Sequence, residues 1–228
     1  MTAETVQRTP RPVQEYRAFS VNQVAIERRD TDDIPELRIS GHAAVFDKET
    51  DILGLFREVI RPGAFRRAIA ERQDVALLLN HDPSTVMARV SNGTLQLSED
   101  EIGLRFEASL DPNDSDAQRT VAKIERGNIT QMSFAFDAIG EQWHREQDPP
   151  LREILDSDLF DVSPVTYPAY QQTDVHAREI ARRNGFDPDA LAGVPADDPS
   201  LAARYRARNR QIDLRRKRMN IESSRKSV

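Results

Sequence analysis

The sequence predicts an α+β fold that is rich in β-strands, mostly antiparallel, and folded into a closed or partly closed barrel flanked by helices. Apolar stretches of strand length recur between residues 16 and 166, separated by turn signals that contain Gly, Pro, Asn and Asp. A few segments in the same region have the period of an amphipathic helix. Strands that follow one another at short spacing favour antiparallel pairing, which a barrel accommodates without long crossovers.

The first part of this region is expected to form strands that are interrupted by one helix. Residues 16–27 alternate loosely, residues 37–46 are a strand candidate with an internal Gly typical of a bulge, and residues 55–60 form a short apolar run. Pro62 suits the first turn of a short helix over 62–72, because the start of a helix leaves backbone N–H groups unpaired and proline has none.

The second part is denser in strands and contains one amphipathic helix. Strands are expected over residues 75–80, 86–90, 94–98, 102–110, 129–138 and 152–166. The sequence SNGT at 91–94 is typical of a hairpin turn. Residues 115–126 place apolar side chains on one helical face, and Gly127 can end that helix.

Composition divides the chain into four parts. We expect a disordered N-terminal arm over residues 1–15, a core domain over 16–184, a Pro/Gly/Asp-rich linker over 185–199 and a basic helical tail over 200–228. The tail carries a net charge of +8, although the whole chain carries −6. This asymmetry suggests an electrostatic partner for the tail, and a solvated helix that follows the core domain is the alternative.

Several classes of site and location are disfavoured by composition. The chain contains no Cys, which excludes a disulfide scaffold, a thiolate metal site and a cysteine nucleophile and suits a reducing cytoplasm. It has no HExxH motif and no Gly-rich phosphate loop, so we expect neither a metal nor a cofactor. Apolar stretches are too short to span a bilayer, and the N-terminus lacks the apolar region of a secretory signal.

Three strand-like segments each carry one reactive side chain. His81 follows the run 75–80, Ser133 lies within the strand 129–138, and Asp161 lies within the strand 152–166. A base, a hydroxyl and a carboxylate on rigid strands are the parts that nucleophilic acyl transfer requires. The Ser133 face of its strand is small and polar, which leaves room for a peptide carbonyl to approach.

The pattern alone leaves other interpretations open. A serine on a half-exposed strand and a histidine in a turn are both common without any catalytic role. His144, in a polar segment after the Ser133 strand, is the main rival base, whereas His42 lies inside a strand and is expected to be structural. Ser163 points to the same side as Asp161 and could assist it.

The segments GHAAVFDKETD, FREVIRPGAF, LLLNHDPSTVMARV, GNITQMSFAF and LFDVSPVTYPAY occur in this order. Together they resemble the prohead maturation serine protease family of tailed bacteriophages over roughly residues 17–175. That family is similar in fold to the herpesvirus assemblins, with a β-barrel flanked by helices. The resemblance implies that His81 and Ser133 are catalytic and that Asp161, where the family often has Glu, is the third member. Arg89 matches a recurring family arginine with an oxyanion or structural role.

The resemblance also implies a function. The chain is expected to be a serine endopeptidase that needs no cofactor and cleaves scaffold or major capsid protein segments, and itself, during phage procapsid maturation. Its expected location is the host cytoplasm, inside the assembling procapsid, or a bacterial cytoplasm if a prophage encodes it. A catalytically silent scaffolding or capsid-interaction protein with the same barrel is the alternative. Nucleic acid and membranes are not expected as partners, and a homo-oligomer is left open.

Overall fold

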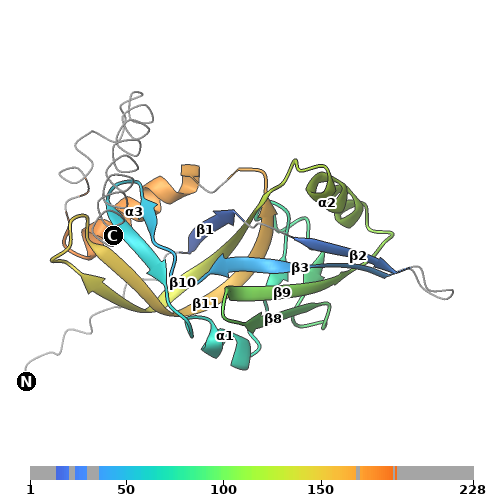
Figure 1. Cartoon of the computed structure of the whole chain (residues 1–228), viewed down its shortest axis with the longest axis horizontal. Helices are drawn as coiled ribbons and strands as arrows, with labels where there is room; N and C mark the ends of the chain where they lie inside the picture. Colours follow the sequence, from blue (N-terminus) through green and yellow to red (C-terminus); the bar gives the residue numbers. More distant parts are fainter. Residues whose placement is uncertain (1–13, 21–23, 30–35, 168–169, 187, 189–228) are drawn as a thin grey trace, which may run out of the picture.

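The computed structural model describes residues 14–20, 24–29, 36–167, 170–186 and 188. Within these residues the chain forms a seven-stranded and a four-stranded β-sheet, with three helices placed around them (Figure 1). The predicted β-rich α+β class is therefore confirmed. No helix in the described part of the chain has the length and the apolar character needed to cross a membrane.

The larger sheet carries the strands that are expected to hold the site. Its main path runs in the order β1-β10-β11-β5-β4, and β6 and β7 attach through β11. The strands are β1 (Glu15–Ser20), β4 (Thr50–Ile52), β5 (Phe56–Ile60), β6 (Ala76–Leu77), β7 (Ala88–Arg89), β10 (Gln131–His144) and β11 (Leu151–Val165). β11 pairs in parallel with β5 and β6, whereas the other pairs are antiparallel.

The smaller sheet is antiparallel throughout and runs in the order β2-β3-β9-β8. Its strands are β2 (Ala25–Arg29), β3 (Glu36–Val45), β8 (Leu95–Glu99) and β9 (Gly103–Leu110). The register of β3 shifts between His42 and Ala44, so the bulge predicted for this strand is present. At this bulge a Cβ on Gly103 would lie 2.0 Å from the carbonyl oxygen of Ala44, which only glycine avoids.

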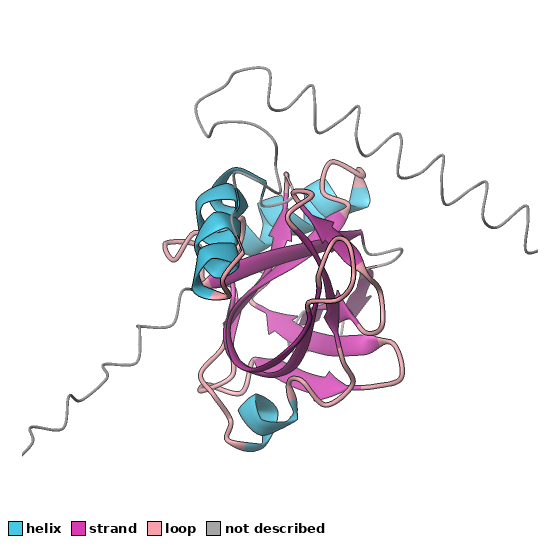
Figure 2. Ribbon diagram, turned by 90° about the vertical axis from the view of Figure 1, so that its left-hand side faces the viewer, coloured by secondary structure: helices cyan, strands magenta, loops and turns pink. Residues whose placement is uncertain are grey.

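The closed barrel stays a prediction. The long strands curve around the core in Figure 2, and β3 packs next to both β1 and β10. In the described residues, however, the smaller sheet ends at β2 and β8, the larger sheet ends at β1, β4 and β7, and neither sheet pairs with itself to close a ring. Closure would require continuous strand pairing around the whole circumference.

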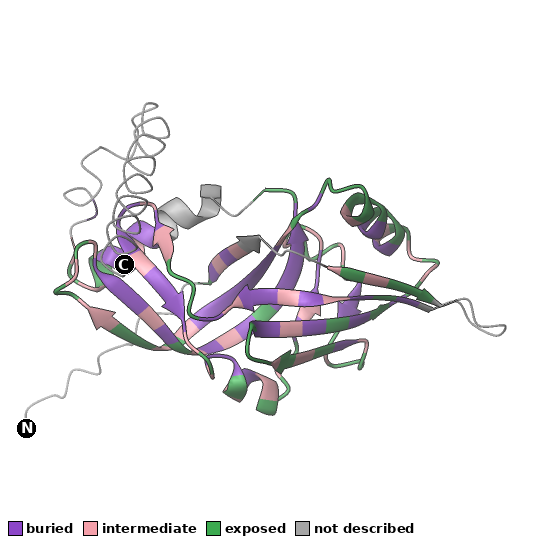
Figure 3. Cartoon of the chain, in the orientation of Figure 1, coloured by how far each residue is buried: buried purple, intermediate pink, exposed green. Residues whose placement is uncertain are grey.

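The side chains of β10 form two rows, one on each face of the strand, and the core residues and Ser133 belong to different rows. Met132, Phe134 and Phe136 belong to the main core cluster, and the rings of Phe65 and Phe134 meet edge-on at a centroid distance of 5.5 Å. Buried residues concentrate in the strands of both sheets (Figure 3), and on β10 residues 132–137 are buried on both faces. Because side chains alternate along a strand, Ser133 points to the opposite face of β10 from the core residues.

The described residues contain three helices, α1 (Arg66–Ala70), α2 (Ser115–Glu125) and α3 (Tyr170–Arg183). The first two differ from the predictions mainly at their boundaries. α2 begins as expected, since Asp114 caps it by accepting a hydrogen bond from the backbone N–H of Asp116. The helix predicted from Pro62 starts four residues later, because residues 62–65 form a turn.

The N-terminal part corrects one prediction. Residues 16–27 do not form one strand, because β1 pairs with β10 in the larger sheet and β2 pairs with β3 in the smaller one. Residues 1–13 of the predicted arm lie outside the described residues, as do most of the linker and the whole tail. The proposed division into arm, core, linker and tail therefore stays a prediction.

Candidate active site

The structure brings His81, Ser133 and Asp161 together, although Ser133 lies 52 residues and Asp161 lies 80 residues after His81 in the sequence. The Nδ1 atom of His81 lies 2.6 Å from Oδ1 of Asp161, and its Nε2 atom lies 2.7 Å from Oγ of Ser133. An ionised carboxylate can only accept a hydrogen bond, so Nδ1–H donates to Asp161. Nε2 is then free to accept the hydroxyl proton of Ser133.

Strand register places the hydroxyl and the carboxylate on one face. In the antiparallel β10–β11 pair, Ser133 lies opposite Ser163, and Ala135 lies opposite Asp161. Residues directly opposite each other in such a pair point to the same face, and so do residues two apart on one strand. Asp161 also pairs with Ala76 of the parallel strand β6, so the segment that leads to His81 runs beside the carboxylate.

A strained turn after β6 directs His81 towards the two strands. Asn80 and His81 both have left-handed backbones, with φ values of 55° and 59°. Such a conformation is uncommon for residues other than glycine, but Asn tolerates it better than most. The N–H of Asn80 donates to the carbonyl of Pro164 at 3.0 Å, and its Oδ1 accepts from the N–H of Thr166 at 2.8 Å. Both bonds fasten the turn to the end of β11.

The rest of the turn is closed by its own side chains. The Thr85 hydroxyl accepts from the N–H of Leu79 at 3.0 Å and donates to the carbonyl of Asp82 at 2.8 Å. Asp82 accepts from both the N–H and the hydroxyl of Ser84, and these bonds lower its pKa. Residues 79–85 therefore form a compact turn that holds His81 from both sides.

A second hydroxyl supports the carboxylate. Ser163 is fully buried, and its Oγ donates to Oδ1 of Asp161 at 2.7 Å, the same oxygen that faces His81. The negative charge of Asp161 also acts on Tyr16, whose pKa is raised first by burial and then by this carboxylate. Two donors on one oxygen leave the carboxylate little freedom to rotate.

The site is nearly closed to solvent. Ser133 is 0% exposed, Asp161 is 5% exposed, and the side chain of His81 is 12% exposed. A low-dielectric environment strengthens hydrogen bonds to charged groups. Ser133 has no exposed surface, so any molecule that approaches its Oγ requires neighbouring groups to move.

The rival residues lie elsewhere. His144 is at the other end of β10, eleven residues from Ser133, or about 35 Å at the rise of a strand, and lies 3.5 Å from Glu153. His42 pairs with Asp100 at 2.8 Å. The guanidinium of Arg89 donates to Asp74 at 2.9 Å, and the role of this arginine stays a prediction.

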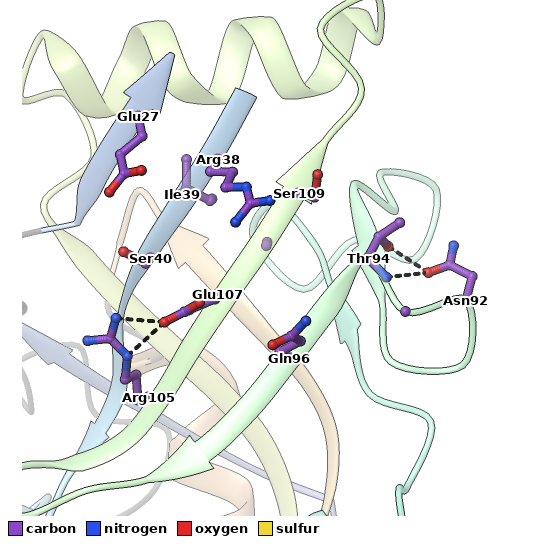
Figure 4. A pocket seen from close by; sticks show the side chains of 12 residues that line it. Glu27, Arg38, Ile39, Ser40, Asn92, Thr94, Gln96, Arg105, Glu107 and Ser109 are labelled. Atoms are coloured by element: carbon purple, nitrogen blue, oxygen red, sulfur yellow. Dashed lines mark hydrogen bonds and ion pairs between the residues drawn. The ribbon is translucent and has the colours of Figure 1, made fainter. Parts of the chain in front are cut away.

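A separate hollow of about 500 Å³ opens on the outer face of the smaller sheet (Figure 4). Its lining is polar and includes the ion pair between Arg105 and Glu107. None of the three residues of the candidate site lines it.

Sequence reasoning missed two residues at the site. Asn80 lies directly before His81, but its left-handed backbone and its hydrogen bond to Thr166 depend on the fold and not on the local sequence. Tyr16 lies on β1, and its ring centroid is 4.7 Å from that of His81 in an edge-to-face arrangement. The pairing of β1 with β10 creates this contact, and periodicity within one segment cannot reveal it.

A hydroxyl, an imidazole and a carboxylate in hydrogen-bond contact are the arrangement that serine proteases use. The chain belongs to the caudovirus prohead serine protease family, whose model matches residues 23–185. This confirms the family expected from the sequence, and the matched range includes all three residues. Among solved structures, the bacteriophage T4 capsid assembly protease gp21 is similar at 13% identity with a TM-score of 0.48, covering 70% of this chain and 100% of that one. The comparison with curated proteins found no match.

Proposed function

We propose that the protein is a serine endopeptidase with Ser133 as nucleophile, His81 as general base and Asp161 as the group that orients the imidazole. The pair of hydrogen bonds at 2.6 and 2.7 Å through one imidazole carries this proposal. The membership of the chain in the caudovirus prohead serine protease family supports the same assignment.

The reaction follows from these positions. His81 Nε2 takes the proton as Ser133 Oγ bonds to the peptide carbonyl carbon, and Asp161 stabilises the resulting imidazolium. When the tetrahedral intermediate collapses, the C–N bond breaks and Nε2 returns the proton to the leaving amine. Water then attacks the acyl-serine with the same base and releases the second fragment.

The proposed substrates are segments of the scaffold or major capsid protein, and the protease itself, inside an assembling procapsid in the host cytoplasm. The prohead setting in the family description supports this choice. The basic tail is proposed to dock on an acidic scaffold or coat surface, because its charge of +8 is opposite to that of the rest of the chain. A clasp on the chain's own acidic body is the competing role for the tail.

A truncation separates the two roles of the tail and should start at residue 189. Phe186 must stay, because its ring packs on Trp143 at 5.2 Å. Docking predicts that a protein lacking 189–228 cleaves peptides normally but is not incorporated into procapsids. A clasp predicts higher activity of the isolated protein after truncation.

The direct test of function is co-expression with the capsid protein, followed by mass spectrometry of the fragments. Ser133→Ala is expected to abolish processing, because losing a triad nucleophile costs on the order of a million-fold in rate. Ser157→Ala is a matched control. Ser157, on β11, is fully buried like Ser133, but its hydroxyl donates to the carbonyl of Ala64 and does not contact His81. Undiminished processing by Ser133→Ala would refute the proposal.

A further inference from the structure

The N-terminal strand β1 lies directly against the strand of the proposed nucleophile. Ala18 is opposite Ser133, and Tyr16 is opposite Ala135, which in turn is opposite Asp161. Directly opposite residues share a face. Tyr16 therefore projects on the same side of the sheet as the hydroxyl and the carboxylate, and the small side chain of Ala135 lies between Tyr16 and Asp161.

On this face the Tyr16 ring meets the His81 ring. Their centroids are 4.7 Å apart with an interplanar angle of 68°, which is a favourable edge-to-face geometry for aromatic rings. Burial, and after it the charge of Asp161, raises the pKa of the Tyr16 phenol, so the side chain stays neutral at working pH. A neutral ring can contact the imidazole in both of its protonation states.

The opposite face of β1 anchors the strand. Arg17 donates to Glu58 at 2.5 Å and to Glu15 at 2.7 Å, and Arg152 donates to Glu15 at 2.7 Å and to Glu58 at 2.9 Å. All four side chains are at least 94% buried. These ion pairs connect β1 to β5 and β11. They therefore fix the position of β1 relative to those strands, and with it the position at which the Tyr16 ring contacts His81.

The two hydrogen bonds of His81 fix its imidazole at the two nitrogens. They resist tilting of the ring about the axis that joins those atoms less than they resist displacement of the nitrogens. The Tyr16 ring, which meets the imidazole at an interplanar angle of 68°, restricts that tilt by direct contact.

We propose that Tyr16 is a positioning residue that holds the His81 imidazole between Ser133 and Asp161. The proposal deepens the proposed protease function and rests on it. It concerns a strand that precedes the segment matched by the family model, residues 23–185. The aromatic ring, and not the hydroxyl group, supplies the effect.

Three variants test the proposal: Tyr16→Phe keeps the ring, Tyr16→Leu keeps most of the volume, and Tyr16→Ala removes both. Tyr16→Leu and Tyr16→Ala are expected to lower kcat by about 2- to 10-fold with little change in KM, given the strength of aromatic pairs. Tyr16→Phe is expected to keep kcat within about twofold of the wild-type value. Near-UV circular dichroism checks that each variant is folded, and Tyr16→Leu serves if Tyr16→Ala is not.

A second measurement is independent of cleavage. In the wild type, the Nδ1–H proton of His81 is donated to buried Asp161 and should give a slowly exchanging low-field NMR signal, assigned by its loss in His81→Ala. This signal should persist in Tyr16→Phe and broaden in Tyr16→Leu. If the wild type cleaves nothing but the signal still broadens in Tyr16→Leu, positioning stands and the protease proposal fails. Wild-type kcat and an unchanged signal in folded Tyr16→Leu would overturn the positioning role.

Discussion

Asn80 provides a quantitative test of how the turn before His81 positions the base. Its backbone is left-handed at φ 55°, and its side-chain oxygen accepts the N–H of Thr166 at 2.8 Å. Three substitutions separate these two features. Asn80→Gly keeps the backbone conformation but loses the bond, Asn80→Ala loses both, and Asn80→Asp keeps an acceptor oxygen at the same place.

The expected magnitudes follow from the two features. A left-handed backbone costs most residues with a Cβ about 1–2 kcal/mol, whereas Asn and Asp adopt it more readily, and a lost hydrogen bond costs about 0.5–1.5 kcal/mol. Asn80→Ala should therefore lose about 1.5–3.5 kcal/mol, shared between folding stability and the population of turns that present His81 correctly. Asn80→Gly should lose only the hydrogen-bond part, and Asn80→Asp the least.

The assay combines kcat/KM on a quenched peptide substrate with the free energy of unfolding from urea denaturation. Summed over both measurements, the loss of free energy should be smallest for Asn80→Asp, larger for Asn80→Gly and largest for Asn80→Ala. The reasoning fails if Asn80→Ala matches the wild type in both. It also fails if Asn80→Gly loses as much as Asn80→Ala, because the strained backbone would then contribute nothing.

Asp161→Asn should keep the fold but slow cleavage on the order of 10⁴-fold, because the amide favours the wrong imidazole tautomer; wild-type turnover would remove Asp161 from the site. His144→Ala should cleave peptides at the wild-type rate, and its inactivity would make His144 the base. Arg17→Met should lower the free energy of unfolding by about 3–5 kcal/mol, measured in urea, because it leaves buried Glu58 with one partner fewer. Burial alone would raise the pKa of Glu58, but Arg17 and a second buried arginine lower it. The ionised Glu58 carboxylate therefore contributes to stability above pH ~4.3, and this contribution is lost as the pH falls further; a wild-type protein as stable at pH 3 as at pH 7 would contradict this.

Local sequence patterns predicted most elements of the core. Alternation predicted strands at 102–110 and 129–138, and helical periodicity with Gly127 predicted the amphipathic helix over 115–126. These features depend on residues a few positions apart, so one segment contains the whole signal. Local patterns also placed Ser133 and Asp161 within strands and His81 directly after one, whereas the resemblance to a family was needed to single them out as catalytic.

Pairing between distant strands could not be predicted in this way. Residues 16–27 alternate in a manner compatible with one strand, but the chain crosses from one sheet to the other within them. The parallel pairing of β6 with β11 brings His81 to Asp161, and nothing in either segment specifies that partner. The contact of Tyr16 with His81 depends on the same kind of long-range pairing.

Covalent trapping of Ser133 tests the central claim most directly. The folded protein would be incubated with a peptidyl phosphonate that reacts with activated serines, digested, and mapped by mass spectrometry. We predict one adduct on Ser133 in the wild type, none in His81→Ala, and loss of cleavage in proportion to labelling. Because Ser133 is fully buried, the labelling rate also reports how often the site opens. A preparation that cleaves its substrate while Ser133 stays unlabelled, or that carries the adduct on another residue, would contradict the assignment.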